Sequence, residues 1–218
     1  MTQQPTSSNR ALDDRPVAIR ALTSDELSAA TALLTRGMLS NPLHLKVFGV
    51  DPVHLKRRLS RFLGPLMTYV HSNGVVIGAF VQGQMIGVLG MIKPGYCRPR
   101  LGDRLSIAGS ILTSAPPTVL LRIYIWLAIW ARNDPDEPHW HIGPLAVLPE
   151  NRQSGVGRHL MQFCCQKLDS LEATAWLETD LAINAEFYRS LGFVMVRKEP
   201  VLGVPIWFMS RSPEWAQG

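Results

Sequence analysis

Cysteine is scarce in this sequence: only Cys97, Cys164 and Cys165 occur among 218 residues. Their spacing matches neither a metal-ligand motif nor a disulfide framework. Cys164 and Cys165 are adjacent in a helical pattern, so one is expected to face the core and the other its edge. Free thiols of this kind are typical of a reducing compartment, and we therefore expect a cytoplasmic protein.

The sequence also lacks an uninterrupted apolar run that could cross a membrane. Residues 106–130 are rich in Ile, Leu and Trp, but Pro116 and Pro117 interrupt them and Arg122 lies in the second half. The remaining apolar stretches fall short of the ~20 residues that a spanning helix needs. We expect two buried or pocket-lining helices here and no membrane association.

Nothing near the first residue has the apolar segment of a signal peptide. Residues 1–15 are polar and include Asp13 and Asp14. Such a segment is typical of a flexible tail rather than of a targeting sequence.

Runs of basic residues interleaved with aromatics are missing as well, which argues against nucleic acid as a partner. Lys and Arg number 22 against 17 Asp and Glu, giving a net charge of +5. This excess is compatible with an anionic small ligand and equally with an ordinary surface. Hydrophobic residues make up 46% of the chain, enough for a sizeable core.

Apolar periodicity and turn residues predict the element order β-α-α-β-β-(insertion)-β-α-β-α-β-β. Strands are expected at 17–20, 75–81, 85–92, 139–148, 173–179, 193–197 and 205–210. Helices are expected after Thr23 and Pro52 and at 154–171 and 183–191. The insertion, about 94–137, is expected to hold a loop and two short helices, about 103–114 and 117–131. Pro65 should kink or split the helix that follows Pro52. We predict an α/β (α+β) fold in one domain, 16–211, with a C-terminal tail at 212–218.

The loop between the strand ending at Leu148 and the next helix is typical of an anion-binding site. Gly155 and Gly157 let the backbone approach a ligand closely. The N–H groups of the first helical turn would then point at a phosphate, with the helix dipole behind them. Arg152 and Arg158 add positive charge on either side. Because a Gly-x-Gly turn can also merely cap a helix, its surroundings must decide.

Two nucleotide-binding alternatives do not fit this loop. A Walker loop requires a lysine after its last glycine, and no such lysine is present. A dinucleotide fingerprint requires a third glycine where this chain has Leu160, although Glu178 could serve as the acidic ribose partner. The residues after the loop are also too few for the remaining strands of a doubly wound fold.

Two motifs in order carry a family resemblance. They are Leu145-x-Val147-x-Pro149-x-x-Arg152-x-x-Gly155-x-Gly157 and Asn184-x-x-Phe187-Tyr188-x-x-x-Gly192-Phe193. Together they resemble the acetyl-CoA-binding motif and the second hallmark of the GNAT N-acetyltransferases, over about residues 16–211. The resemblance implies a mixed, mainly antiparallel sheet of six to seven strands flanked by helices, and acetyl-CoA as acyl donor.

The resemblance also implies which residues hold the donor. In the family, the strand before the loop splays from the next strand, and its free backbone groups bind the pantetheine arm. Pro144 fits this picture, because proline inside a strand belongs at a bulge or an unpaired edge. The implied cofactor-binding residues are Leu145, Ala146 and Val147 on the strand, Arg152, Gln153, Ser154, Gly155, Val156, Gly157 and Arg158 in the loop, and Asn184. The alternative for Leu145 and Val147 is a plain core position, and for Asn184 a helix N-cap.

Tyr188 and His141 are the catalytic candidates that the resemblance implies. A tyrosine at the position of Tyr188 protonates the departing CoA thiolate in many members. Its alternative is packing beside Phe187. Some members have a glutamate base eleven residues before the first loop position, where this chain has His141. Imidazole titrates near neutrality and suits proton transfer.

Other groups could take the place of His141. His139, two residues earlier on the same strand face, and Glu137 and Glu178 are reserves, and His141 could instead be purely structural. Water could also relay the proton, so that no single base is essential.

The expected function is direct transfer of an acetyl group from acetyl-CoA to a primary amine, of a small molecule, in a ternary complex. No metal or redox cofactor is implied, and a homodimer is left open. Trp126, Trp130, Tyr124 and Leu120 could line an acceptor pocket, although an aromatic stripe is more often core. The alternatives are a protein N-terminal or lysine acetyltransferase, a non-catalytic acyl-CoA-binding regulator, and a structural domain that never meets CoA.

Overall fold

Seven strands form one mixed sheet in the computed structural model, which describes residues 16–99, 101–112 and 115–213. Their order is β1-β2-β3-β4-β5-β7-β6, and all neighbours are antiparallel except β4 and β5. The strands are β1 (Ala18–Ala21), β2 (Gly74–Val81), β3 (Gln84–Ile92), β4 (Trp140–Val147), β5 (Ala175–Thr179), β6 (Val194–Val201) and β7 (Val204–Arg211). This sheet confirms the predicted fold class. The tail predicted at 1–15, and residues 214–218 of the C-terminal tail, lie outside the described residues.

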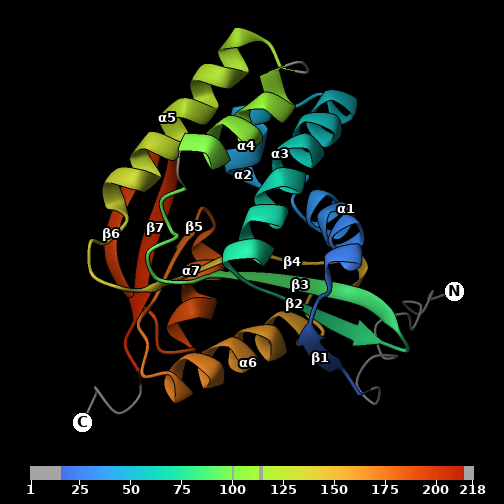
Figure 1. The fold of residues 1–218 in the computed structure, drawn as a ribbon, viewed down its shortest axis with the longest axis vertical. Coiled ribbons are helices and arrows are strands. Elements are labelled where there is room, and N and C mark those ends of the chain that lie inside the picture. Colours follow the sequence, from blue (N-terminus) through green and yellow to red (C-terminus); the bar gives the residue numbers. More distant parts are fainter. Residues whose placement is uncertain (1–15, 100, 113–114, 214–218) are drawn as a thin grey trace, which may run out of the picture.

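Helices cover both faces of the sheet (Figure 1). Helices α1 (Leu27–Gly37) and α3 (Pro52–Asn73) pack on β3, and α6 (Val156–Ser170) packs on the opposite face of the same strand. Helix α7 (Ala182–Arg189) contacts β5, β6 and β7. The remaining helices, α2 (Pro42–Phe48), α4 (Leu101–Leu112) and α5 (Pro117–Asn133), lie together beyond the sheet edge, beside α3.

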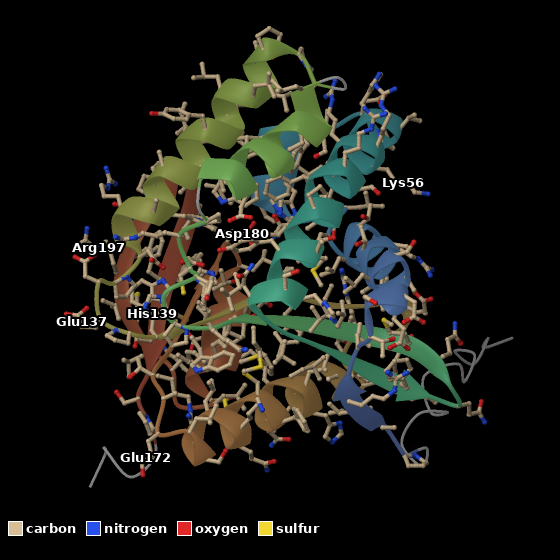
Figure 2. All side chains as sticks on the ribbon, viewed as in Figure 1. Lys56, Glu137, His139, Glu172, Asp180 and Arg197 are labelled. Atoms are coloured by element: carbon tan, nitrogen blue, oxygen red, sulfur yellow. The ribbon has the colours of Figure 1, made fainter. Side chains whose placement is uncertain are left out.

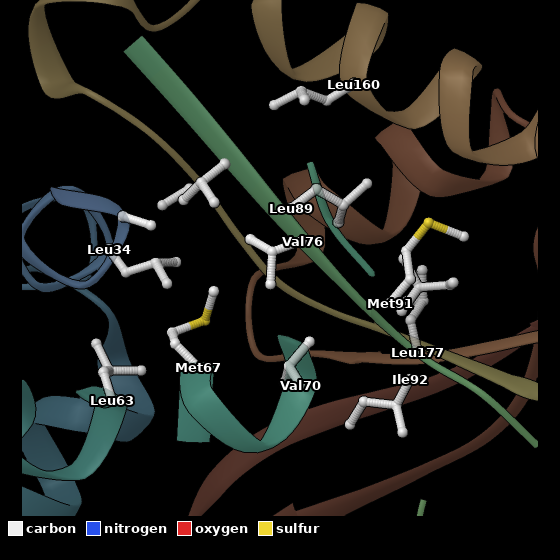
Figure 3. Close-up of a cluster of buried hydrophobic side chains, with 14 of the residues drawn as sticks. Leu34, Leu63, Met67, Val70, Val76, Leu89, Met91, Ile92, Leu160 and Leu177 are labelled. Atoms are coloured by element: carbon white, nitrogen blue, oxygen red, sulfur yellow. The ribbon is translucent and has the colours of Figure 1, made fainter. Parts of the chain in front are cut away.

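The core lies between these layers. Figure 3 shows Leu34 of α1 and Met67 of α3 on one side of β3 and Leu160 of α6 on the other. All three side chains are completely buried. Burial of a side chain of this size contributes about 1.5–3 kcal/mol. Both faces of β3 are therefore committed to packing, and the strand holds β4 in a fixed position.

The β2–β3 hairpin follows the sequence prediction. Its two turn residues, Gln82 and Gly83, have φ angles of 51° and 79°. Two positive φ angles are the signature of a type I′ turn, whose twist matches that of the flanking strands. The space around Gly83 is open, so glycine is needed here for its backbone conformation alone.

Two helices differ from the sequence expectation. Helix α2 was not predicted: the Asn41 side chain accepts a hydrogen bond from His44 N at 2.9 Å, and Pro42 takes the first helical position. Helix α3 is not split at Pro65 and continues to Asn73. Its interior proline is tolerated because the apolar face of α3 is buried along the whole helix.

Strand β4 departs from regular pairing at Pro144. Leu145 pairs with Leu89 and Ile142 with Met91, so that Gly143 and Pro144 together oppose the single residue Gly90. This is a β-bulge, as the proline predicted. A side chain on Gly90 would meet the Gly143 carbonyl oxygen at 2.6 Å, so the bulge requires glycine on the neighbouring strand.

The insertion contains the two predicted helices, α4 and α5, although residues 113–114 of the first prediction lie outside the described part of the chain. Tyr69 ties the loop before them to α3, because its hydroxyl donates to the Tyr96 carbonyl at 2.6 Å. Among the described residues, none of the helices has the length and apolarity to traverse a bilayer.

Candidate active site

The loop after β4 presents a helix N-terminus to solvent. Gln153 and Gly155 have φ angles of 62° and 82°, and Gly155 caps α6. The first helical hydrogen bond runs from His159 N to Gly155 O at 3.0 Å. The N–H groups of the preceding turn thus have no acceptor within the helix. Left-handed loop residues followed by such a turn are a geometry typical of anion-binding sites.

The loop side chains are used differently from the expectation of free positive charge. Arg152 donates to the carbonyl of Gly37, the last residue of α1, and so ties that helix to the loop. Arg158 donates to Ser190 Oγ at 3.1 Å and lies over the Phe187 ring. Ser154 Oγ donates to the Asn151 carbonyl at 2.6 Å. The loop therefore offers mainly backbone groups to a ligand, and Arg152 ties the loop to α1.

Strands β4 and β5 separate just before this loop. They pair only at Trp140 with Ala175 and at His141 with Trp176. From Ile142 onwards β4 stays paired with β3 but has no ladder with β5. The edge of β4 that faces β5 is thus open along residues 145–147, the positions predicted to bind a pantetheine arm.

Packing explains how β4 is held while one edge is open. Ala146 is buried, and Gly37 of α1 approaches it so closely that an added Cβ would lie 2.8 Å from its side chain. Leu145 and Val147 are half-buried and pack on the core. The side chains of residues 145–147 therefore pack on the core while the backbone edge of the same residues stays unpaired on the side of β5.

Asn184 does not cap α7. The helix N-cap is Leu181, whose N–H donates to Thr179 Oγ1 at 3.4 Å, and Asn184 is the third helical residue. Its side chain is half-buried. The capping interpretation is thereby wrong, because the helix already begins at Ala182, before Asn184.

Tyr188 is buried on the inner face of α7. Its ring packs against Phe187 and Phe193, with centroids 5.2 and 5.9 Å away. Burial raises the pKa of the phenol above its usual value, and Cys164 and Asp180 raise it further. The hydroxyl therefore stays protonated over the whole physiological range, as a proton donor must.

His141 lies between two carboxylates. Its Nε2 is 3.1 Å from Glu178 Oε2, and its Nδ1 is 3.8 Å from Asp134 Oδ1. Trp176 Nε1 donates to the other Glu178 oxygen at 2.8 Å. The buried Nδ1 of His141 has no hydrogen-bond partner among the described residues.

His139 shares Asp134 with His141. Its Nε2 is 3.2 Å from Asp134 Oδ1, and its Nδ1 donates to the Glu137 carbonyl at 2.8 Å (Figure 2). Glu137 contributes only this backbone oxygen, and its side chain is exposed. Of the three alternative bases, His139 and Glu178 lie close to His141, whereas the Glu137 carboxylate is exposed and does not face it.

The charges in this cluster are strongly coupled. Burial lowers the pKa of His139, but the hydrogen bonds with Asp134, with Cys97 and with the Glu137 backbone together outweigh it and raise the pKa to about 10. Burial likewise opposes the charged ring of His141, while Glu178 and Asp134 raise its pKa well above 6.5. The two imidazoles hold the pKa of Asp134 below its usual value despite burial.

Sequence reasoning missed Asp134 and Cys97. They follow α5 and β3, far from the strand that carries the two histidines, and only the folded chain brings them together. The one available signal was the acidic turn at 133–138 directly before His139.

An aromatic cluster connects α2 and α5 to His141. Trp126 lies 5.6 Å from His44 and 5.0 Å from Trp130, and Trp130 lies 6.5 Å from His141, between ring centroids. Trp126 is buried, as the core interpretation predicted, whereas Tyr124 is 70% exposed and belongs to no pocket of this cluster. The buried indole nitrogens of Trp126 and Trp130 have no partner within the described chain.

Asp180 fastens α2 to this region. Its carboxylate accepts hydrogen bonds from Asn41 Nδ2 at 2.7 Å and from Leu43 N at 2.9 Å. Because Asp180 directly follows β5, the bonds hold the start of α2 beside the end of that strand (Figure 2). His44 on α2 is buried, and this burial lowers its pKa to about 4, with Asp180 opposing the shift.

A cleft of about 550 Å³ opens beside the side chains of Asp134 and His139. Asp134, His139 and Trp176 contribute to its lining, together with residues of the 132–138 turn and β6. Solvent and small solutes can therefore approach Asp134 and His139 from this side.

The chain matches the model of a known protein family. Residues 50–193 match the family model described as Acetyltransferase (GNAT) family. No curated protein sequence matches the chain.

Solved structures share the fold. A histone acetyltransferase HPA2-related acetyltransferase of Corynebacterium glutamicum is 22% identical, with 90% of this chain and 96% of that chain covered and a TM-score of 0.65. The yncA protein of Salmonella typhimurium, solved with acetyl-CoA, is 15% identical over 90% and 94%, with a TM-score of 0.55. A Drosophila melanogaster polyamine N-acetyltransferase is 13% identical over 90% and 100%, with a TM-score of 0.56.

Proposed function

Because the chain belongs to the GNAT acetyltransferase family, we propose that it acetylates the primary amine of a small molecule, by direct attack on acetyl-CoA in a ternary complex. Family membership makes the chain an N-acetyltransferase that uses acetyl-CoA. The observation that carries the proposal is the separation of β4 from β5 directly before the helix N-terminus at Gly155. Residues 16–211 form one such acyltransferase domain, in a cytoplasmic protein.

The proposed donor site uses main-chain groups along β4 and the following loop. Leu145, Ala146 and Val147 offer their open backbone edge to the pantetheine arm. The amides of the loop from Arg152 to Arg158 receive the pyrophosphate, and a backbone amide near Val147 polarises the thioester carbonyl. Asn184, half-buried on α7, contacts CoA near the arm. Holding donor and acceptor together in this way contributes proximity.

Two side chains account for the protons of the reaction. An ammonium group must lose a proton before nitrogen attacks, and His141 Nδ1 is the proposed acceptor because that buried atom has no hydrogen-bond partner among the described residues. Only the neutral ring can act, so the raised pKa of His141 favours transfer at higher pH, and Glu178 holds Nε2. Tyr188 gives its proton to the departing thiolate. The water-relay alternative predicts that replacing His141 leaves transfer intact.

The proposed acceptor enters beside the aromatic cluster of α2 and α5. Buried, unpartnered nitrogens on Trp126 and Trp130 give this region hydrogen-bonding capacity next to His141. The polyamine enzyme above, and an agmatine N-acetyltransferase that is 14% identical with a TM-score of 0.60, support small amines as the class. A small amine also matches a site whose polar groups are few and enclosed.

The experiment is a product screen. Purified protein, acetyl-CoA and a panel of small amines are incubated, and products 42 Da heavier are sought by mass spectrometry, with thermal shift by acetyl-CoA measured in parallel. Acetylation of small amines supports the proposal. Stabilisation without turnover indicates the CoA-binding regulator, and acetylation confined to protein substrates indicates the protein acetyltransferase.

A further inference from the structure

Four metal-binding side chains converge beside the catalytic candidates. They are Cys97 after β3, Asp134 after α5, His139 directly before β4 and His141 on β4. One ligand atom from each lies within 4.8 Å of all the others. His139 and His141 are two residues apart, and both side chains face Asp134.

Each nitrogen and oxygen ligand is oriented through its other polar atom. His139 Nδ1 donates to the Glu137 carbonyl, which leaves Nε2 facing Asp134. His141 Nε2 contacts Glu178, which leaves Nδ1 facing the same carboxylate. Outer-sphere partners of this kind, carbonyls and carboxylates on the remote nitrogen, fix the tautomer and ring direction of metal-bound histidines.

Asp134 is arranged in the same way. Its Oδ2 lies 3.2 Å from Arg98 Nε, and its Oδ1 faces both imidazoles. Cys97 Sγ lies 3.7 Å from the His139 carbonyl and is half-buried. The remaining polar atoms of these three side chains thus face one another around one point, and the thiol completes the set.

One atom of this set is otherwise unexplained. His141 Nδ1 is buried and has no partner within the described chain, although a carboxylate oxygen lies 3.8 Å away. A buried polar nitrogen without a partner is costly, and a bound ion would satisfy it.

We propose that Cys97, Asp134, His139 and His141 bind a zinc-like divalent transition metal ion, and that the ion inhibits acetyl transfer by occupying His141 Nδ1. A thiolate, two imidazoles and one carboxylate suit Zn²⁺ in a tetrahedral site. On binding, the Cys97 thiol proton and the protons that His139 Nε2 and His141 Nδ1 carry in the charged rings leave to solvent, and the thiolate charge and that of Asp134 balance the ion. No redox change is involved. The cleft of about 550 Å³ that Asp134 and His139 line provides the way in.

Binding is tested with Co²⁺ as a probe on the purified full chain under reducing conditions. We expect one equivalent, with a thiolate-to-cobalt charge-transfer band and the intense visible absorption of a tetrahedral site. Cys97→Ser should lose the charge-transfer band, whereas Cys165→Ala, which removes a thiol outside the cluster, should keep it. His139→Gln should weaken Co²⁺ and Zn²⁺ binding at least tenfold, and His54→Gln, which removes an exposed histidine paired with Asp51, should not. Absence of the band in wild type, or its persistence in Cys97→Ser, would overturn the site.

Inhibition rests on the proposed function and has its own readout. With an accepted amine, Zn²⁺ should abolish transfer, a chelator should restore it, and Cys97→Ser should need at least tenfold more Zn²⁺. If Zn²⁺ binds but transfer is unaffected, the inhibitory part is wrong. If no amine is acetylated under any condition, the proposed function fails, while the cobalt spectra still decide the metal site.

Discussion

The carboxylate of Glu178 lies 3.1 Å from His141 Nε2 and accepts a hydrogen bond from Trp176 Nε1 at 2.8 Å. Trp176 and Glu178 are two residues apart on β5, while His141 lies on β4 at the last pair before the strands separate. The contact therefore links β4 and β5 at the point where their pairing ends. It fixes the direction of the imidazole where the acceptor amine is proposed to lose its proton.

Replacing His141 should remove most of the activity if its ring takes that proton. We expect His141→Gln to lower kcat on the order of 10²-fold, the usual contribution of a positioned base, with a smaller effect on the KM for acetyl-CoA. Steady-state kinetics with a saturating donor measure this. His159→Gln, on the exposed side of α6, is the matched control. Wild-type kcat in the first variant would favour relay through water.

Tyr188→Phe should keep the fold and lose the proton donor. The ring packing against Phe187 and Phe193 is preserved, so thermal stability should change little. We expect kcat to fall by on the order of 10²-fold. Tyr124→Phe, at an exposed position of α5, should leave kcat unchanged. Equal kcat for Tyr188→Phe and wild type would remove Tyr188 from the mechanism.

Gly155→Ala should separate backbone strain from donor binding. A Cβ at φ 82° costs about 1–2 kcal/mol. Gly83→Ala imposes the same kind of strain at φ 79°, at the tip of the β2–β3 hairpin. Both variants should lose similar stability in denaturant titrations. Only Gly155→Ala should raise the KM for acetyl-CoA, on the order of tenfold; a similar rise in Gly83→Ala would mean that the loop is not the anion site.

His44 should make the protein sensitive to acid. Its pKa is lowered to about 4 by burial, whereas an unfolded histidine titrates near 6.5. Between these values the unfolded chain binds a proton that the folded chain does not, so stability falls as pH drops from 6.5 to about 4. The loss is roughly 3 kcal/mol. Unfolding free energies at several pH values should show this slope, and His44→Leu should flatten it, while exposed His159→Leu should not.

Local signals predicted the parts of this fold that local chemistry decides. The two-residue turn between β2 and β3 and the bulge at Pro144 each depend on neighbours in sequence. Helix α3 is not split at Pro65, because tertiary packing along the helix outweighs one lost helical hydrogen bond. Helix α2 was missed because Asn41-Pro42, which interrupts a helix, can also start one.

In the candidate site, too, the parts that are continuous in sequence could be predicted and those assembled from distant segments could not. The loop from Arg152 to Arg158 could be predicted because it is one continuous segment with a motif. Glu178 was already an alternative base, but Cys97 and Asp134 could not be joined to His141 in advance, since three separate segments supply these residues. Their proximity follows from the order of the strands in the sheet and from the path of the insertion. Neither can be predicted from the spacing of residues in the sequence.

The parting of β4 from β5 has a consequence for how such a protein can diversify. In the proposed donor site main-chain atoms of the strand hold CoA, so substitutions there that still fit the packing against α1 would not alter affinity for CoA. Acceptor preference, in contrast, would reside in the side chains of α2 and α5 and could change independently. Solved structures keep this fold at 13–22% identity to the chain.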